Sequence, residues 1–381
     1  MFECGSLNSE MEPFIPQELP VEEVAWEPLI PLIGRANWQL AEYNGVLTTL
    51  PNPELLLAPL TTQEAVLSSK IEGTQATLGE VLKFEAGEEP EQESRRQDIR
   101  EIMNYRRALR EAEGELRTRP FNLNLLLQLH ATLLDSVRGR NKARGNFRVE
   151  QNWIGAPGSK IEEAQFIPPA PGKPLLDALY NWESYYHLQR PDTLVQLAII
   201  HAQFEILHPF LDGNGRLGRI LIPIFLSEKG LLSQPVFYMS AYLESNRERY
   251  VEHLRILGKV EGAWNRWVEF FLEGLIHQAQ ANVIKARQIH NLYEELKRQI
   301  LDLTHSQYAV PLLDNMFEQP IFRSTHLDSR SNMPSRPMIM NMLGKLKKAD
   351  ILKTIAEGRG PHAQVLALAK LVNLCEEKEV V

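Results

Sequence analysis

Apolar residues recur at three- and four-residue spacing along most of the 381-residue chain, which is the pattern of amphipathic helices. Glycine and proline fall mostly between these stretches, where helices are expected to break. The pattern predicts helices over 27–49, 62–84, 98–116, 122–137, 173–188, 192–207, 214–229, 240–258 and 263–300. We therefore expect an all-α fold, a bundle of helices.

The segment 147–172 departs from the helical pattern. In FRVEQNWIGAPGSKIEEAQFIPPAPG, two short β-prone pieces flank a turn rich in glycine, proline and serine. A small β-hairpin is one interpretation and a plain connector between helices is the other. The local pattern alone does not choose between them.

The sequence pattern changes again after residue 300. Three short helical pieces, SQYAVPLLDNMF, RSTHLDSRSN and SRPMIMNMLGKLKKAD, precede an apolar-rich stretch around the turn EGRG. Three helices followed by a two-stranded wing predict a winged helix-turn-helix domain. The length also favours more than one domain. We expect an N-terminal helical region over 1–120, a core over 121–300 and a C-terminal domain over 301–381.

Composition narrows the class of protein. A hydrophobic content of 44% and a charged content of 24% are those of a soluble globular chain, and no apolar run approaches a membrane span. Two cysteines are too few for a disulfide framework, and the N-terminus lacks the features of a secretory signal, so we expect a cytoplasmic protein. The net charge of -8 disfavours nonspecific nucleic-acid binding by the whole chain. An anionic ligand therefore needs a local cluster of donors.

Such a cluster occurs in HPFLDGNGRLGR, residues 208–219, which joins two apolar helical runs. Gly213 and Gly215 allow positive φ and bring successive N–H groups to the start of the second helix. This arrangement is an anion nest, and the helix dipole reinforces it. Arg216 and Arg219 share a face of that helix, where an anion between them would relieve their repulsion.

Two further residues of this segment suit catalysis. His208 has an ordinary pKa that fits a general base near neutral pH, and Asp212 offers the hard oxygen ligand that Mg²⁺ prefers. Each alone has a common structural explanation, as a surface imidazole or a turn residue. A base, a metal ligand, a nest and two cations within twelve residues favour a site for phosphate chemistry.

The same segment resembles the active-site motif of the Fic family, H-x-F-x-[DE]-G-N-G-R-x-x-R, and matches it at every specified position. The resemblance implies a protein adenylyltransferase, in which His208 deprotonates a Ser, Thr or Tyr hydroxyl of a target protein and Asp212 holds Mg²⁺. The hydroxyl oxygen would attack the α-phosphorus of the co-substrate ATP, and pyrophosphate would leave. The residues that the resemblance assigns to the triphosphate are Gly213, Asn214, Gly215, Arg216 and Arg219.

The stretch TTQEAVLSSKIEG, residues 61–73, predicts a separate amphipathic helix. Thr61 and Glu64 have the spacing of a capping box, and Gly73 provides a glycine stop. Glu72 falls in the last turn, where the helix dipole disfavours a carboxylate. A cationic partner elsewhere in the fold would offset that penalty.

The end of this stretch, SSKIEG, resembles the inhibitory motif of Fic proteins, [ST]-x-x-x-E-[GN], with Ser68, Glu72 and Gly73 in the defining positions. The resemblance implies that Glu72 pairs with Arg219 and keeps the γ-phosphate of ATP from binding productively. The alternative is an exposed glutamate on a surface helix.

Two other stretches are similar to family features. The 147–172 segment resembles the flap, which implies a hairpin that can bind an extended target segment as an added strand. The candidate target-binding residues are Gln165, Phe166, Ile167 and Pro168. SAYLESNRERYVEHL, 240–254, resembles the wall around adenine and ribose, although aromatic residues at this spacing also suit a core. The candidates there are Tyr242, Asn246 and Tyr250.

The expected partners follow from these assignments. The N-terminal stretch 36–47 is also similar to two-domain bacterial Fic adenylyltransferases of the SoFic type, which implies ATP and target proteins, the chain itself included, as partners. From residue 296 onward the chain has 12 Lys or Arg against 9 Asp or Glu, a mild excess, so packing on the core or binding of protein is slightly favoured over DNA binding. The basic residues are Arg323, Arg330, Arg336, Lys345, Lys347 and Lys348. A homodimer is left open, and no membrane association is expected.

Two rival functions remain at this point. The first keeps the site but transfers another phosphate-containing group or removes AMP. The second is a DNA-binding regulator in which the Fic core acts as a sensor.

Overall fold

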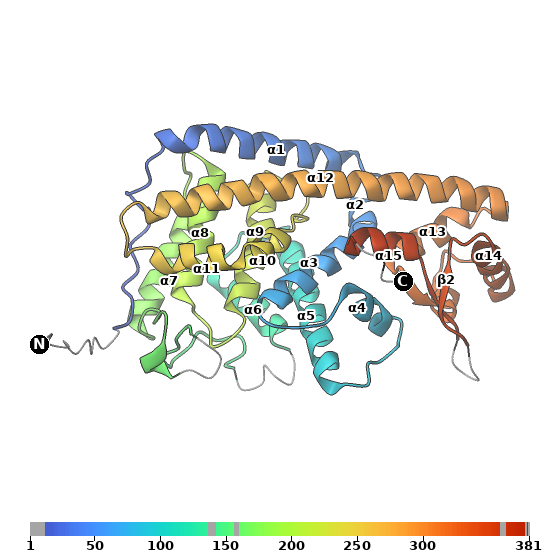
Figure 1. The fold of residues 1–381 in the computed structure, drawn as a ribbon, viewed down its shortest axis with the longest axis horizontal. Helices are drawn as coiled ribbons and strands as arrows, with labels where there is room; N and C mark the ends of the chain where they lie inside the picture. The colour runs from blue at the N-terminus through green and yellow to red at the C-terminus, as the bar shows by residue number, and fades with distance from the viewer. Residues whose placement is uncertain (1–11, 136–141, 156–159, 359–362, 378, 380–381) are drawn as a thin grey trace, which may run out of the picture.

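The computed structural model describes residues 12–135, 142–155, 160–358, 363–377 and 379. Almost all of its regular structure is helical, which confirms the predicted all-α class. Figure 1 shows α12 (Ala263–Thr304) extending along the molecule with α1 (Ile30–Thr49) beside it. None of the helices in the described ranges combines the length and apolar character needed to cross a bilayer.

Helices of the first 256 residues form the part of the fold that carries the candidate site. Helices α8 and α9 lie at its centre, and nearly every residue of α8 is buried because α7, α9 and α12 pack around it. The core therefore anchors both ends of the loop 208–213. The elements are η1 (Glu27–Leu29), α2 (Pro53–Leu56), α3 (Ala58–Ile71), α4 (Leu78–Glu85), α5 (Glu93–Leu116), α6 (Leu123–Leu133), η2 (Ile161–Glu163), α7 (Lys173–His187), α8 (Thr193–Leu207), α9 (Asn214–Glu228), α10 (Ser240–Ser245) and α11 (Arg247–Ile256).

Two of the predicted helices are each divided in the structure. The stretch 62–84 contains most of α3 and all but the last residue of α4, and 240–258 contains α10 and α11. Helix α4 begins with a true capping box: Glu80 N donates to the Thr77 hydroxyl at 3.2 Å, and Thr77 N donates to the Glu80 carboxylate at 2.8 Å. The apolar spacing continues across this break, so periodicity alone did not reveal it.

The start of α3 differs from the prediction. The helix begins three residues before Thr61, with Pro59 in its first turn, so the predicted capping box of Thr61 and Glu64 is wrong. Glu64 is instead buried, and its carboxylate accepts from the Ser240 hydroxyl at 2.6 Å. The predicted glycine stop holds, because Gly73 follows the helix with a φ of 102°.

The flap is a minimal β structure. Ile154 and Phe166 form one antiparallel bridge, in which Ile154 N donates to Phe166 O at 2.8 Å and Phe166 N donates to Ile154 O at 3.1 Å. The two β-prone pieces of 147–172 thus pair with each other, through a bridge and not through long strands. The turn expected at 156–159 lies outside the described residues.

After α12 the chain forms a small mixed module that packs on the rest of the protein. Its sheet has three antiparallel strands in the order β1-β3-β2, and β1 was not predicted. Helix α15 lies beside α3 and α12 (Figure 1), and β1 contacts α4. Part of the predicted wing, 359–362, lies outside the described residues. The elements are α13 (Ala309–Glu318), β1 (Ile321–Arg323), η3 (Ser324–Ser329), α14 (Arg336–Lys348), β2 (Lys353–Ala356), β3 (Val365–Ala367) and α15 (Ala369–Glu376).

Candidate active site

His208 follows the last residue of α8 in a left-handed backbone conformation, with a φ of 44°. Its Nδ1 lies 3.3 Å from the carbonyl oxygen of Glu205. A carbonyl only accepts, so Nδ1 carries the hydrogen and Nε2 is the basic nitrogen. Burial lowers the pKa of His208 to about 4. The imidazole is therefore neutral at neutral pH, which is the state that a general base requires.

The loop after His208 is closed by its own side chains. Asn214 is 2% exposed; its Oδ1 accepts from Phe210 N at 2.9 Å, and its Nδ2 donates to Phe210 O at 2.8 Å. The His130 ring stacks on Phe210 with centroids 3.8 Å apart and contacts Asp212 O at 3.0 Å. Asn214 was expected at the triphosphate, but here both of its amide atoms are used within the loop.

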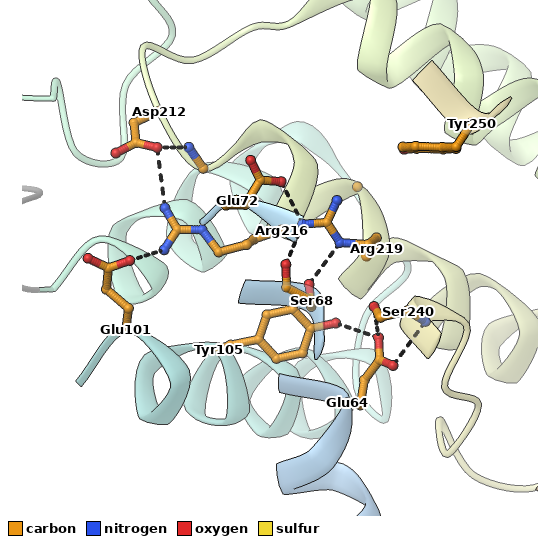
Figure 2. Close-up of polar contacts among 12 residues, drawn as sticks. Glu64, Ser68, Glu72, Glu101, Tyr105, Asp212, Arg216, Arg219, Ser240 and Tyr250 are labelled. Atoms are coloured by element: carbon orange, nitrogen blue, oxygen red, sulfur yellow. Dashed lines mark hydrogen bonds and ion pairs between the residues drawn. The ribbon is translucent and has the colours of Figure 1, made fainter. Parts of the chain in front are cut away.

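Arg216 is likewise already paired. Its Nη1 donates to Glu101 Oε2 at 2.9 Å and its Nη2 to Asp212 Oδ1 at 3.3 Å, and its side chain is 4% exposed (Figure 2). The structure therefore places this predicted phosphate cation between two carboxylates, one of which comes from α5. Arg216 thereby orients Asp212.

Asp212 fits the role of a magnesium ligand. Its side chain is 42% exposed, and its Oδ1 accepts from Gly213 N at 2.6 Å. Within the described residues no group of three or more His, Cys, Asp or Glu is arranged to hold a metal ion. Mg²⁺ commonly uses one or two carboxylates and takes its other ligands from water and substrate phosphates. A single orienting carboxylate beside an anion nest matches that mode.

Arg219 and Glu72 form an ion pair across the site. Arg219 Nη2 donates to Glu72 Oε1 at 2.6 Å, and the same guanidinium donates to Ser68 Oγ at 2.8 Å and Ser68 O at 2.9 Å (Figure 2). Burial raises the pKa of Glu72, but the Arg219 charge outweighs burial and the net pKa lies below its ordinary value. The pairing of Glu72 with Arg219 that the sequence resemblance implied is thus present in the structure, and Ser68 binds the same guanidinium.

Glu72 occupies the start of α9. A Cβ added to Gly215 would lie 2.3 Å from Glu72 Oε1, so the carboxylate packs directly on the first turn of that helix. Free N–H groups and the helix dipole favour an anion at this place. A side chain at position 215 would displace the carboxylate. The Glu72 carboxylate thus lies against the place where the sequence predicted a bound anion.

A cavity of about 180 Å³ opens above these groups. Gln165 and Phe166 of the flap line it, whereas Ile167 and Pro168 are not among its lining residues. Its wall on the α11 side contains Tyr250. The remaining lining residues are Ile71, Glu72, Ile154, Glu205, Ile206, His208, Gly215, Arg219, Arg247, Val251, Leu254 and Arg255.

The three residues predicted to contact adenine and ribose, on α10 and α11, do not line the same cavity. Tyr250 faces the cavity, but Tyr242 and Asn246 line another cleft, of about 700 Å³, that also reaches Glu64 on α3. Arg247 and Leu254 line the His208 cavity although they were not predicted. Their spacing with residue 250, three before and four after, marks one face of a helix and is the signal that could have found them.

Tyr250 is fixed by a buried histidine. His201 Nδ1 lies 3.1 Å from Gly218 O, and its Nε2 lies 2.9 Å from the Tyr250 hydroxyl. The carbonyl accepts from Nδ1, so the tyrosine donates to Nε2. Burial lowers the pKa of His201 to about 3, which keeps the ring neutral. The Tyr250 oxygen is thereby left to accept from Arg219.

Glu205 is a second carboxyl group in the cavity that sequence reasoning missed. Burial raises its pKa to about 7, and its Oε1 is buried without a hydrogen-bond partner in the described structure. A Cβ added to Gly218 would lie 2.3 Å from that oxygen. Its place in the last turn of α8, three residues before His208, was the available signal.

Comparison with known proteins identifies the class that this fold and site define. Residues 30–113 match the Fic/DOC family N-terminal model, and residues 120–226 match the Fic/DOC family model. Together the two matches cover about half of the chain. The chain belongs to the Fic/DOC family.

Individual relatives are similar over parts of their length. A probable protein adenylyltransferase of Aquifex aeolicus is 29% identical over 220 residues, which are 56% of this chain and 58% of that protein. The protein adenylyltransferase Fic of Drosophila melanogaster is 28% identical over 153 residues, 39% of this chain and 27% of the relative. The chain thus spans less than two thirds of either curated relative.

Solved structures share the fold. A Fic family protein from Desulfovibrio desulfuricans G20 superposes with a TM-score of 0.56 at 19% identity, covering 90% of this chain and 96% of that one. Fic-1 from C. elegans, residues 134–508, superposes with a TM-score of 0.52 at 16% identity, covering 70% and 75%. At these identities the likeness concerns the fold.

Proposed function

We propose that this protein transfers AMP from ATP to hydroxyl groups of target proteins and that Glu72 restrains this activity at rest. One observation carries the proposal. A neutral His208, the carboxylate of Asp212 and the guanidinium of Arg219 converge on the start of α9, where a carboxylate of the chain already occupies the anion position. The adenylyltransferase names of the Aquifex and Drosophila relatives support the same class of reaction.

In the proposed reaction His208 Nε2 accepts the proton of the target hydroxyl. The hydroxyl oxygen forms a bond to the α-phosphorus, the bond from that phosphorus to its bridging oxygen breaks, and pyrophosphate leaves. Arg219 and the amide of Gly215 bind the triphosphate, whereas the amide of Gly213 donates to Asp212 and helps to orient it. Asp212 would hold Mg²⁺, which supplies charge neutralisation of the phosphates when bound.

Asn214 and Arg216 contribute to this reaction through the loop. Asn214 closes it through Phe210, and Arg216 orients Asp212 while Glu101 compensates its charge. We therefore assign both residues a positioning role, in place of the direct phosphate contact implied by the resemblance.

Inhibition follows from competition for Arg219. The guanidinium is 2% exposed and is already bound by Ser68 and Glu72, so a γ-phosphate would have to displace the Glu72 carboxylate. Release of that carboxylate from the start of α9 restores an empty anion nest. The proposed activator is any event that withdraws the C-terminal end of α3.

The experiment that tests the function measures label transfer from ATP labelled at the α-phosphate. The Glu72→Gly protein, with and without His208→Ala, is incubated with cell lysate, and the modified side chain is identified by mass spectrometry. AMP on a Ser, Thr or Tyr side chain supports the proposal. A different added group, or loss of AMP from a modified protein, would establish the rival reactions of the same site.

For the flap we propose a target-docking role. The bridge between Ile154 and Phe166 borders the cavity that contains His208, so an extended target segment that pairs beside it would present its hydroxyl to the base. Gln165 and Phe166 line the cavity directly. Ile167 and Pro168 continue the same edge of the flap.

For the C-terminal module we propose a winged helix that packs on the core. The order α13-β1-η3-α14-β2-β3 supports the winged-helix assignment. Five of its six predicted basic residues have partners within the chain, which argues against a DNA-binding face. These contacts are Arg323–Glu88 at 3.0 Å, Arg330–Glu318 at 3.0 Å, Arg336–Asp328 at 3.7 Å, Lys345 Nζ to Leu303 O at 3.0 Å and Lys347 Nζ to Gln364 Oε1 at 3.0 Å. Sequence-specific binding of duplex DNA by the whole chain would instead support the regulator.

A further inference from the structure

Arg148 lies at the base of the flap and binds main-chain carbonyl groups at and around His208. Its Nε donates to His208 O at 2.9 Å, and its Nη2 donates to Leu207 O at 3.4 Å and to Pro169 O. Its backbone N also donates to Pro209 O at 2.9 Å. One residue therefore binds the last carbonyl group of α8, the first two carbonyl groups of the catalytic loop and one carbonyl group of the flap.

Two neighbours of Arg148 extend this contact. Asn152 Nδ2 donates to His208 O at 3.3 Å and to Phe210 O at 3.0 Å, and Gln151 Nε2 donates to Pro168 O at 2.9 Å. We call Arg148, Gln151 and Asn152 the flap bracket. Its side chains connect the catalytic loop with the proline pair that ends the flap.

The use of a buried arginine in this way is unusual. Arg148 is 1% exposed, and the hydrogen bonds found for its side chain in the described structure all lead to main-chain oxygens. Buried arginines are normally paired with a carboxylate, because burying a charge alone is costly. Burial lowers the pKa of Arg148 to about 10, which leaves the guanidinium charged at neutral pH.

The conformation of His208 gives this arrangement a purpose. A positive φ, here 44°, is uncommon for a residue other than glycine, and such strain persists only where the surroundings impose it. The backbone conformation sets the direction of the imidazole. The bracket meets the strained residue at its carbonyl group from two side chains, Arg148 and Asn152.

We propose that the flap bracket positions the catalytic base. The bracket couples the orientation of the His208 imidazole to the position of the flap. Arg148 is its principal member, because it alone binds both the loop and the flap with its side chain. The inference rests on the proposed function in that His208 is the base. A target segment that seats the flap thereby also tightens the geometry of the base.

The first arm of the test measures catalysis with Arg148→Gln and Arg148→Lys, each in the Glu72→Gly background. We expect Arg148→Gln to lower the rate of label transfer at saturating ATP by about 10- to 100-fold, since small misplacements of a reacting group have effects of this size. The dissociation constant of ATP should change by less than about threefold, because no phosphate contact is removed. Arg148→Lys keeps the charge but reaches fewer carbonyl groups, so its transfer rate should lie between those of Arg148→Gln and the parent protein.

Arg106→Gln is the matched control. Arg106 is also buried, at 9% exposure, but it pairs with Glu85 at 2.7 Å and does not line the cavity. We expect this variant to transfer label at the rate of its parent even if its melting temperature falls. Equal losses of transfer in Arg106→Gln and Arg148→Gln would show that loss of any buried arginine has this effect and would overturn the positioning role.

The second arm does not depend on activity. Hydrogen exchange of the Ile154 and Phe166 amides should accelerate in Arg148→Gln while exchange in α8 and α12 stays unchanged. Uniform acceleration throughout the chain would mean that Arg148 only supports the fold. If flap exchange does not change, the bracket is refuted, whether or not the chain transfers AMP.

A titration of the His208 ring by NMR separates charge from geometry. The charges that act on this ring are Glu72 at the end of α3, Asp212 on the loop and Arg148 on the flap. The charged residues that share its cavity are Glu205, Arg219, Arg247 and Arg255. Loss of the Arg148 charge should raise the pKa of His208 in Arg148→Gln but not in Arg148→Lys. An equal rise in both variants would indicate entry of water beside the ring, which also follows from a loosened flap. If the pKa of His208 rises in neither variant, the proposal is overturned. If the pKa rises and flap exchange changes in a chain that shows no transfer activity, only the proposed function is refuted.

Discussion

Replacement of Glu72 by glycine is the most direct perturbation of the site. The substitution removes the carboxylate that binds Arg219 and packs on the first turn of α9. It leaves the Ser68 contacts of Arg219 in place. Position 72 has φ −87° and ψ 0° at the C-terminal end of α3, where glycine is readily accommodated. The freed Arg219 guanidinium can then bind the γ-phosphate of ATP.

The size of the effect follows from the ion pair. A charge-assisted hydrogen bond contributes about 1.5–3 kcal/mol when it is shielded from water. The Glu72 side chain is 39% exposed, so solvent screening lowers this to about 1–2 kcal/mol. This free energy corresponds to a factor of about 5 to 30 in an equilibrium. We therefore expect transfer at subsaturating ATP to rise by about 5- to 30-fold.

The assay is label transfer from ATP under matched protein and magnesium concentrations. Glu72→Gln keeps a hydrogen-bonding side chain without the charge and should give an intermediate rise. Lys70→Ala is the control for a general disturbance of α3, because Lys70 lies on the same helix, 52% exposed, and pairs with Glu244 at 2.8 Å. It should leave transfer unchanged. ATP should also raise the melting temperature of Glu72→Gly more than that of the unmodified protein.

Two results would refute the reasoning. Unchanged transfer by Glu72→Gly, with ATP shown to bind, would mean that the ion pair does not restrain the reaction. Activation of Lys70→Ala to the same level would mean that loosening of α3, and not release of Arg219, is responsible.

The remaining predictions concern the base, the metal and pH. His208→Ala should abolish transfer while ATP affinity stays within about threefold, because the base makes no essential phosphate contact; calorimetry with ATP checks this, and a collapse of affinity would contradict the role. A chelator of Mg²⁺ should stop transfer, and Asp212→Ala should raise the magnesium concentration required for half-maximal rate; undiminished turnover in the chelator would remove Asp212 from the metal site. Because the pKa of His208 lies near 4, transfer by Glu72→Gly should stay level from pH 8 to about 5.5, and a fall centred near pH 6.5 would show an unshifted base. Burial lowers the pKa of His130 to about 4 and that of His201 to about 3, so the unfolded chain binds more protons below pH 6.5. The stability contributed by these two neutral rings is thus complete above that pH and should fall by about 2 kcal/mol or more between pH 6.5 and 5, measured by urea unfolding.

The sequence by itself determined the features that depend on neighbours along the chain. Helical periodicity requires only residues within a few turns, and it located the helices to within a few residues in most cases. The motif at 208–219 is also local, because a nest at a helix start and a base before it arise from consecutive residues. Of its two central glycines, Gly213 has the expected positive φ, 81°, whereas Gly215 lies inside α9 without a positive φ and instead touches Glu72.

The tertiary structure decided which side chains meet. Arg216 donates a hydrogen bond to Glu101, which is 115 positions away in sequence, and Arg219 donates one to Ser68, which is 151 positions away. No local pattern contains such pairs, so Arg216 was assigned to phosphate although a carboxylate of α5 neutralises it. Only the resemblance to a known family anticipated the pairing of Arg219 with Glu72.

The same reason explains the differences elsewhere. Tyr242 lies on α10 and lines another cleft, whereas Tyr250 lies on the separate helix α11 and lines the His208 cavity. Glu64 has the spacing of a helix cap, but burial and its contact with Ser240 determine its position. Arg148 carries no sequence signal at all, since its partners are main-chain oxygens. Local spacing predicts what a residue is able to do, and long-range packing decides which partner it has.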